Sequence, residues 1–246
     1  HAEDVRSLLD TVKLMAEVKV VRRWPRRDGA AAPAAAGPAR APERRVRIIA
    51  IGASTGGPQV LHQVLERLPQ AVSVPILIVQ HIAAGFTGGL AEWLDQATPL
   101  EVKVAAQGET ARPGCAYLAP EGHQMGITNG GRIALVQGTG GDPFCPSVSH
   151  LFRSVVASYG AAAMGVLLTG MGRDGADGLL RLREAGALTV AQDEATSVVF
   201  GMPREAIALG AAEYVLAPQA IAELIRSELP LGGGNEGGPV ERGGMG

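Results

Sequence analysis

Short apolar runs alternate with amphipathic stretches through the middle of the chain, from about Val46 to about Leu229. The runs have the length and composition of strands buried on both faces, and they lie at residues 48–51, 76–79 and 166–168. Between them, apolar residues recur at the three- and four-residue spacing of helices, at 60–68, 90–94 and 179–182. This alternation predicts an α/β fold: a doubly wound, mostly parallel sheet with helices on both faces, in a Rossmann-like arrangement of three layers.

A turn signal, Asn129-Gly130-Gly131, interrupts the alternation. It lies between two short apolar runs at 125–127 and 133–135. Asparagine and glycine adopt the positive φ angles that tight hairpin turns need. Residues 124–136 are therefore predicted to form a β-hairpin appended to the sheet.

The two ends of the chain differ in composition from its middle. Apolar residues at helical spacing between Val5 and Val21 predict a helix whose apolar face needs a partner, so residues 1–21 are interpreted as the remnant of an upstream domain. Residues 22–45, rich in Pro, Ala and Arg, predict a linker, and residues 230–246, rich in Gly, predict a flexible tail. The main domain is expected at 46–229.

Composition excludes several classes of function. With 46% hydrophobic and 19% charged residues, the 246-residue chain is typical of a soluble globular protein. No apolar run reaches the length of a bilayer and no signal peptide begins the sequence, which favours a cytoplasmic location without membrane insertion. The basic cluster at 22–27 lacks the repeated alternation of aromatic and basic residues found in single-strand binders and is interpreted as a solvated tether, so no nucleic-acid partner is expected. Cys115 and Cys145 are too far apart to signal a zinc site or a disulfide framework.

The turn that follows the first apolar run, Gly52-Ala53-Ser54-Thr55-Gly56-Gly57, allows more than one function. A dinucleotide loop needs a glycine where Ser54 stands, and no Gly-Lys-Ser/Thr follows as in a P-loop, but phosphate binding by an α/β domain stays as the alternative. The same residues satisfy Gly-x-Ser-x-Gly, a sharp turn that exposes a nucleophilic serine. They would also serve as a plain turn with Ser54 or Thr55 as helix N-cap.

A serine nucleophile needs a base and an orienting carboxylate. Of five histidines, His81 alone directly follows a predicted buried strand, at the sheet edge where Ser54 should emerge. Asp174 lies in a glycine-rich turn after the third run, whereas Asp177 falls inside the next helix. A histidine satisfied near the core and an aspartate N-cap are the alternatives. The catalytic interpretation requires the Ser54 hydroxyl to lie about 3 Å from the His81 ring, or somewhat farther without ligand.

Several motifs together resemble one family. They are Gly52-Ala53-Ser54-Thr55-Gly56-Gly57-Pro58, Val79-Gln80-His81, Leu168-Thr169-Gly170-Met171-Gly172-x-Asp174-Gly175, Gln192-Asp193-Glu194 and Phe200-Gly201-Met202-Pro203-Arg204. In this order, over about 46–225, they are similar to the C-terminal catalytic domain of the chemotaxis protein-glutamate methylesterase/glutaminase (CheB) family.

The resemblance implies a serine hydrolase that demethylates glutamate methyl esters on chemoreceptor helices, releases methanol and also deamidates certain receptor glutamines. Ser54 would be the nucleophile, His81 the general base and acid, and Asp174 the orienting carboxylate. The backbone N–H groups of Met171 and Thr55 would form the oxyanion hole. The family needs no metal or organic cofactor, and an upstream receiver domain covers its active site until the receiver is phosphorylated.

Two positions depart from the family's pattern. Ser149 stands where the family commonly has Asp, and Ser147 and Ser149 are expected to begin the next helix. The loop before Met125 is altered as well, which leaves the role of His123 open. Neither departure falls on the three predicted catalytic residues.

Overall fold

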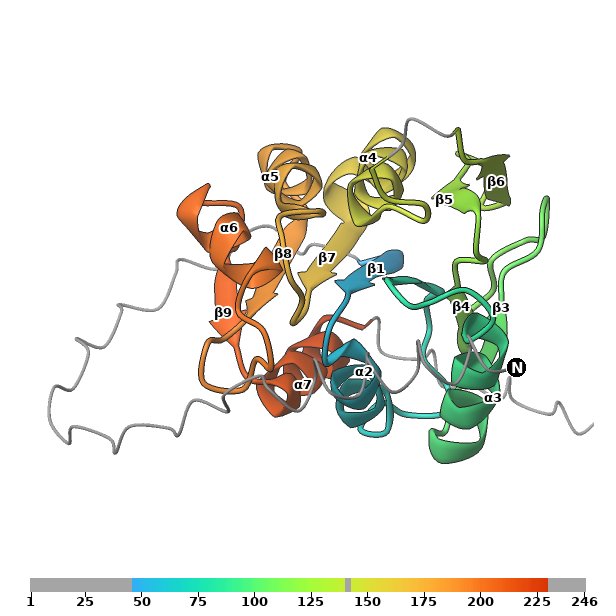
Figure 1. Cartoon of the computed structure of the whole chain (residues 1–246), viewed down its shortest axis with the longest axis horizontal. Helices are drawn as coiled ribbons and strands as arrows, with labels where there is room; N and C mark the ends of the chain where they lie inside the picture. Colours follow the sequence, from blue (N-terminus) through green and yellow to red (C-terminus); the bar gives the residue numbers. More distant parts are fainter. Residues whose placement is uncertain (1–45, 140–142, 230–246) are drawn as a thin grey trace, which may run out of the picture. The chain divides into compact units, whose positions relative to one another are not determined.

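A seven-stranded parallel sheet forms the centre of the molecule (Figure 1). The computed structural model describes residues 46–139 and 143–229. The sheet has the strand order β3-β4-β2-β1-β7-β8-β9, and every pairing within it is parallel. Its strands are β1 (Ile48–Ala53), β2 (Ile76–Gln80), β3 (Glu101–Val104), β4 (Cys115–Leu118), β7 (Ala163–Leu167), β8 (Leu188–Gln192) and β9 (Tyr214–Leu216).

Helices cover both faces of the sheet, so the predicted doubly wound α/β fold is confirmed. They are α2 (Gly57–Leu65), α3 (Thr87–Ala97), α4 (Val148–Tyr159), α5 (Ala176–Glu184), α6 (Met202–Ala208) and α7 (Pro218–Glu228), with a 3₁₀ turn at Gly160–Ala162. Figure 1 shows α2, α3 and α7 on one face and α4, α5 and α6 on the other. Alternate residues of β1 enter the two cores: Ile49 and Ile51 pack on the first side, and Ile48 and Ala50 on the second.

The predicted hairpin is present but it is not part of that sheet. Strands β5 (His123–Ile127) and β6 (Ile133–Gln137) pair antiparallel as a separate two-stranded sheet. The hairpin packs instead on α4, where the Ser154 hydroxyl accepts a hydrogen bond from Ile127 N at 2.7 Å and donates one to Ile127 O at 3.0 Å. The predicted appended hairpin is therefore confirmed, and it forms a small sheet of its own that α4 and the connection between β3 and β4 hold by hydrogen bonds, such as Ile133 N to Glu109 O at 2.7 Å.

The order of the strands places three strand ends together. From β1 the chain moves to β2 on one side, and it later returns to β7 on the other side of β1. In open α/β sheets, ligands bind at the carboxyl ends of the strands where the winding reverses. The residues that follow β1, β2 and β7 therefore share one edge of the sheet.

The described residues, 46–139 and 143–229, fall within the predicted main domain 46–229, whose bounds stay a prediction. The helix and linker expected at 1–21 and 22–45, and the tail expected at 230–246, lie outside the described residues. Within the described ranges, no helix combines the length and apolar character that a membrane span requires.

Candidate active site

Ser54 stands at the sharp turn between β1 and α2. Its backbone N–H donates to Thr169 O at 3.0 Å, which ties the turn to the end of β7. Gly56 has φ +80°, and a Cβ there would lie 2.5 Å from Cβ of Val198. A Cβ on Gly170 would lie 2.6 Å from the Ser54 Cβ. Glycine at these two positions lets two loops close tightly around the serine, as a nucleophile turn requires.

Gln80 fastens the Ser54 turn to the end of β2. Its side chain is buried, and its Nε2 donates to Ser54 O and to His81 O, each at 2.8 Å. The backbone adds a third link, since His81 N donates to Ala53 O at 2.9 Å. Sequence reasoning did not assign Gln80 a role. A polar residue at the end of an otherwise apolar buried strand was the available signal.

His81 and Asp174 form a hydrogen-bonded pair. The His81 Nε2 lies 3.0 Å from Asp174 Oδ2, and the side chains are 16% and 5% exposed. With Nε2 bonded to the carboxylate, Nδ1 is the ring nitrogen left to accept a proton from a nucleophile. The structure therefore joins two of the three predicted catalytic side chains from the ends of β2 and β7.

Three donors at the start of α4 form hydrogen bonds to the Asp174 carboxylate. Val148 N donates to Oδ2 at 2.7 Å, while Ser149 N and the Ser147 hydroxyl donate to Oδ1, each at 3.0 Å. Burial raises the pKa of Asp174, but hydrogen bonds from His81, Ser149 and Val148 outweigh burial and hold this pKa well below its usual range. The carboxyl group is therefore ionised at neutral pH.

Asp174 is not the N-cap of the helix that follows it, which was the alternative to a catalytic role. The N-cap of α5, the helix that follows it in sequence, is Gly175. Asp174 instead binds the N-terminus of α4, where a negative charge is favoured by the helix dipole. Ser147 is the N-cap of α4, as expected, and Ser149 Oγ accepts from Gly175 N at 2.8 Å. Asp177 lies in the first turn of α5, 3.9 Å from Arg173 in an exposed ion pair.

The Ser54 hydroxyl is not hydrogen-bonded to His81 within the described part of the chain. The two residues are neighbours through their backbones, because Ala53 pairs with Gln80 in the sheet. Catalytic hydrogen bonds are often long before substrate binds. The role of Ser54 as nucleophile therefore remains a prediction.

Phe144 covers the His81 ring, and the sequence did not predict this contact. The two rings stack with centroids 5.0 Å apart and an interplanar angle of 6°. Phe144 is 41% exposed, so the stack forms part of the surface beside the site. No local sequence pattern signals this contact, since it depends on how the loop before α4 returns to the end of β2.

The two backbone N–H groups predicted to form the oxyanion hole, those of Thr55 and Met171, lie in the loops that follow β1 and β7. Among the described residues, neither Thr55 N–H nor Met171 N–H donates a hydrogen bond to the protein. The loops that carry them are fixed by Thr169, whose hydroxyl donates to Thr55 O at 3.0 Å and whose own N–H donates to Gln192 Oε1 at 2.8 Å. Unpaired N–H groups in a rigid turn suit developing negative charge on an oxygen.

The other candidate groups lie elsewhere. His62 and His150 are on α2 and α4, as predicted. His123 begins β5, and its Nδ1 lies 2.9 Å from Glu121 O, outside the lining of the cavity beside Asp174. Cys115 and Cys145 do not form a disulfide with each other. In the described ranges, no three His, Cys, Asp or Glu side chains are grouped as metal ligands would be.

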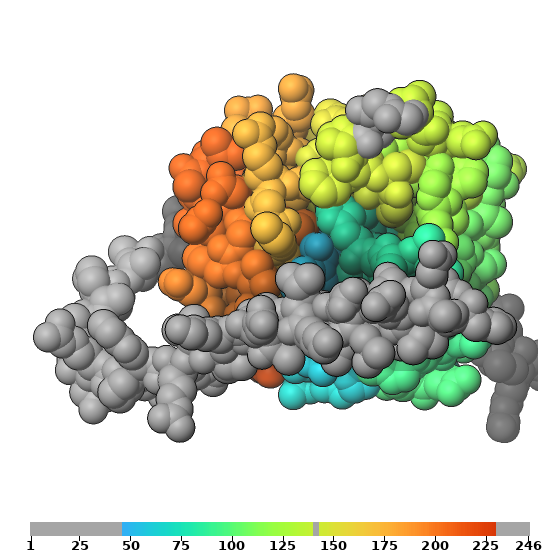
Figure 2. All heavy atoms as spheres, viewed as in Figure 1, coloured from blue at the N-terminus to red at the C-terminus, as the bar shows by residue number. Residues whose placement is uncertain are grey.

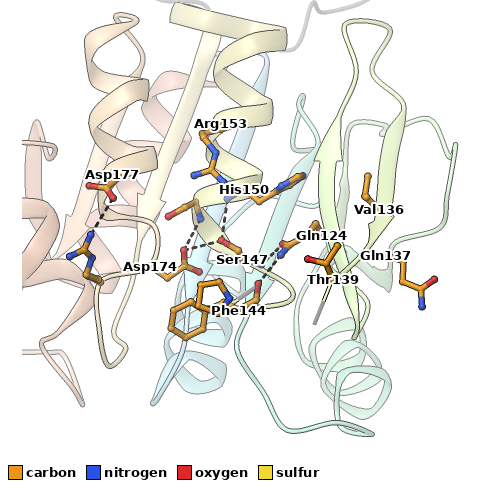
Figure 3. A pocket seen from close by; sticks show the side chains of 13 residues that line it. Gln124, Val136, Gln137, Thr139, Phe144, Ser147, His150, Arg153, Asp174 and Asp177 are labelled. Carbon is orange, nitrogen blue, oxygen red and sulfur yellow. Dashed lines mark hydrogen bonds and ion pairs between the residues drawn. The ribbon is translucent and has the colours of Figure 1, made fainter. Parts of the chain in front are cut away.

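The carboxyl ends of the strands reach the surface of the molecule. In the space-filling view, blue and teal segments near β1 and β2 are visible between the orange and yellow-green segments that carry the second half of the domain (Figure 2). A cavity of about 430 Å³ adjoins Asp174 on the side of α4 and the hairpin (Figure 3). The His81–Asp174 pair therefore has a cavity beside it.

A sequence profile of one family, CheB methylesterase, matches residues 49–225. The chain belongs to the CheB methylesterase family. It is 50% identical over 223 residues to protein-glutamate methylesterase/protein-glutamine glutaminase 1 of Syntrophus aciditrophicus, covering 89% of this chain and 64% of that protein. It is 49% identical over 229 residues to protein-glutamate methylesterase/protein-glutamine glutaminase 4 of Geobacter metallireducens, covering 92% of this chain and 66% of that protein.

A solved structure of the CheB family supports the fold. The crystal structure of the Thermotoga maritima CheB methylesterase catalytic domain superposes with a TM-score of 0.71 at 36% sequence identity, covering 74% of this chain and 98% of that one. The match thus covers almost all of that catalytic domain. The present chain spans just under two thirds of the length of the two relatives named above.

Proposed function

We propose that this chain is a serine hydrolase that removes methyl groups from glutamate methyl esters on chemoreceptor helices, in chemotaxis adaptation. The observation that carries the proposal is the His81–Asp174 hydrogen bond of 3.0 Å, formed at the strand end next to Ser54. The printed names of the relatives support the substrate class, because they are protein-glutamate methylesterases. The proposed roles are nucleophile for Ser54, general base and acid for His81, and orienting carboxylate for Asp174.

The chemistry follows from these roles. The Ser54 hydroxyl attacks the ester carbonyl carbon while His81 Nδ1 takes the hydroxyl proton, and Asp174 stabilises the imidazolium through Nε2. The N–H groups of Thr55 and Met171 bind the resulting oxyanion, each contributing about 3 kcal/mol as such donors typically do. The intermediate collapses, the methoxy group leaves with the proton from His81 as methanol, and an acyl-enzyme remains. Water, deprotonated by His81, then attacks this ester, and glutamate and Ser54 are regenerated.

The same site would act on glutamine side chains. The relatives are also named protein-glutamine glutaminases, and an amide differs from an ester only in the leaving group. His81 would protonate the departing nitrogen, so that ammonia replaces methanol. No additional residue is needed for this second reaction.

The proposal extends to regulation and place of action. The named relatives are longer than this chain, which is consistent with an upstream receiver domain that covers the site until it is phosphorylated. Receptor signalling helices would present the substrate in the cytoplasm. The nucleotide-binding alternative loses its basis, since the family is one of methylesterases and Ser54 occupies the position that a phosphate loop reserves for glycine.

Methanol release decides the proposal. Receptor-containing membranes carrying radiolabelled methyl esters are incubated with the wild-type chain, with Ser54→Ala and with Ser227→Ala as a control. Ser227 is exposed on α7, and its hydroxyl bonds only within that helix, to Leu224 O at 2.8 Å. Loss of the nucleophile should lower kcat by about a million-fold, while the control stays unchanged. Equal release by Ser54→Ala and wild-type protein would refute the mechanism.

A further inference from the structure

The cavity beside Asp174 lies between α4 and the hairpin. It has a volume of about 430 Å³. Figure 3 shows its walls: Ser147, His150 and Arg153 come from α4 and the residue before it, and Gln124, Val136 and Gln137 come from the hairpin. Because Asp174 is itself part of the lining, the cavity adjoins the His81–Asp174 pair. The proposed mechanism does not use this cavity.

Arg153 gives this cavity a cation without a counter-ion. Its side chain is exposed, and no carboxylate of the described residues lies within ion-pair distance of it. Figure 3 shows the side chain extending along α4 toward Ser147, and so toward the His81–Asp174 pair. A long cationic side chain that points into a cavity is placed to bind an anion there.

The acids in the lining do not neutralise Arg153. Both oxygens of Asp174 are occupied, by His81 and by the first turn of α4. Asp177 lies on the other side of this turn in Figure 3 and pairs with Arg173 at 3.9 Å. The α4 side of the cavity therefore holds one guanidinium that has no ion-pair partner among the described residues.

The rest of the wall includes one amide fixed by hydrogen bonds and two exposed apolar side chains. Gln124 uses both ends of its amide on the backbone: Nε2 donates to Phe144 O at 2.7 Å, and Oε1 accepts from Ser147 N at 2.8 Å. Val136 and Phe144 expose 57% and 41% of their surface. An anion with an aliphatic stem fits this combination better than a small inorganic ion does, because its methylene groups can cover the exposed apolar surface.

We propose that the cavity is a specificity subsite for an acidic side chain, a glutamate or aspartate of the same polypeptide that carries the methyl ester. This inference rests on the proposed function. On a helical substrate, residues three or four positions apart lie on one face, with Cβ atoms about 5–6 Å apart. When the ester occupies the site at Ser54 and His81, an acid one helical turn away reaches the neighbouring cavity and pairs with Arg153.

A two-by-two comparison tests the subsite. Two synthetic helical peptides carry one glutamate methyl ester each; in the first, the residues one turn away on both sides are glutamates, and in the second they are glutamines. Methanol release is measured with the wild-type chain, Arg153→Gln and, as a matched control, Arg226→Gln, which removes an exposed arginine from α7 on the other face of the sheet. The wild-type kcat/KM should favour the acidic peptide by about fivefold, as expected for a solvent-accessible ion pair.

Arg153→Gln should reduce this preference to nearly one, and Arg226→Gln should keep it. The inference is overturned if the wild-type chain hydrolyses both peptides equally, or if the preference survives in Arg153→Gln; the proposed function is untouched by either result. If neither peptide is hydrolysed, the proposed function fails, and binding of the two peptides to the same three proteins, measured by fluorescence anisotropy, then decides the subsite alone. Tighter binding of the acidic peptide that depends on Arg153 supports it, and equal binding of both peptides overturns it.

Discussion

Replacing Asp174 with asparagine probes the centre of the site, because the amide keeps the shape of the carboxylate and changes its charge and one acceptor. In the wild-type protein, Oδ2 accepts hydrogen bonds from His81 Nε2 and Val148 N. The other oxygen, Oδ1, accepts from the Ser147 hydroxyl and from Ser149 N. An asparagine has one oxygen and one NH₂ group to place against these four donors.

The least costly orientation points the oxygen toward His81 and the NH₂ group toward Ser147, whose hydroxyl can rotate to accept a hydrogen bond. The N–H of Ser149 then faces another donor and loses its acceptor. A shielded donor without a partner costs about 1–3 kcal/mol. Urea unfolding of Asp174→Asn at neutral pH should therefore give a free energy of unfolding lower by this amount. Glu223→Gln, an exposed carboxylate-to-amide change on α7, is the matched control.

The effect on catalysis is expected to be much larger than the effect on folding. A neutral amide cannot stabilise the positive charge of the imidazolium as a carboxylate does, although its oxygen still accepts a hydrogen bond from Nε2. In serine hydrolases this exchange lowers kcat by about 10⁴-fold. The methanol-release assay on methylated receptor membranes measures it. A variant that keeps more than about a tenth of the wild-type kcat would show that Asp174 is not the orienting carboxylate.

The pH dependence of the stability difference gives a second check. Hydrogen bonds hold the pKa of Asp174 below its usual range despite burial, so its contribution is fully present above the pKa of an unfolded aspartate, about 4. It is lost as the pH falls through the lower pKa of the folded state. The stability gap between wild-type protein and Asp174→Asn should therefore narrow as the pH falls below about 4. A gap that widens in acid contradicts the assigned contacts.

Three further predictions concern neighbouring side chains. Phe144→Leu removes a ring that stacks on His81, so kcat/KM should fall by about two- to fivefold, as expected when a cation–π contact to the imidazolium is lost. Phe144→Tyr keeps an aromatic ring at this position and should leave kcat/KM unchanged. Gln80→Met removes two hydrogen bonds and should lower the free energy of unfolding by about 1–2 kcal/mol; an unchanged urea midpoint would contradict the bracing role of this side chain. Burial raises the pKa of Tyr117 to about 12. The neutral phenol therefore stabilises the fold below about pH 10, and this contribution is lost as the pH rises through 12. Ultraviolet titration of the wild-type protein, compared with Tyr117→Phe, should reveal one late-ionising phenol.

The sequence was sufficient to place the strand ends of the site but not the contacts between them. β1, β2 and β7 are buried on both faces, and their continuous apolar runs distinguish them from helices. The residues Ser54, His81 and Asp174 could therefore be assigned to one sheet edge. Strands β3 and β9 have only four and three residues, too few for a hydrophobic period to be recognised.

What could not be predicted depends on parts of the chain that are distant in sequence. The alternative role considered for Asp174 was N-cap of the helix that follows it, yet it accepts a hydrogen bond from the N–H of Val148, 26 positions earlier in the sequence. The same holds for Phe144 on His81 and for the hairpin, whose partner Ser154 is 27 residues beyond Ile127. Local patterns define elements, whereas such contacts arise only from the way the elements pack.

The first turn of α4 connects these distant parts into one support for the His81–Asp174 pair. Its N–H groups hold the carboxylate, and Ser147 N donates to Gln124 Oε1 on the hairpin. Gln124 Nε2 in turn binds Phe144 O, and the Phe144 ring covers His81. The hairpin pairs with no strand of the main sheet; Gln124, α4 and backbone hydrogen bonds to the β3–β4 connection, such as Ile133 N to Glu109 O at 2.7 Å, hold it in place. An element that looks like an appendage in the topology is therefore joined, by two hydrogen bonds of one amide, to the side chains proposed to perform the chemistry.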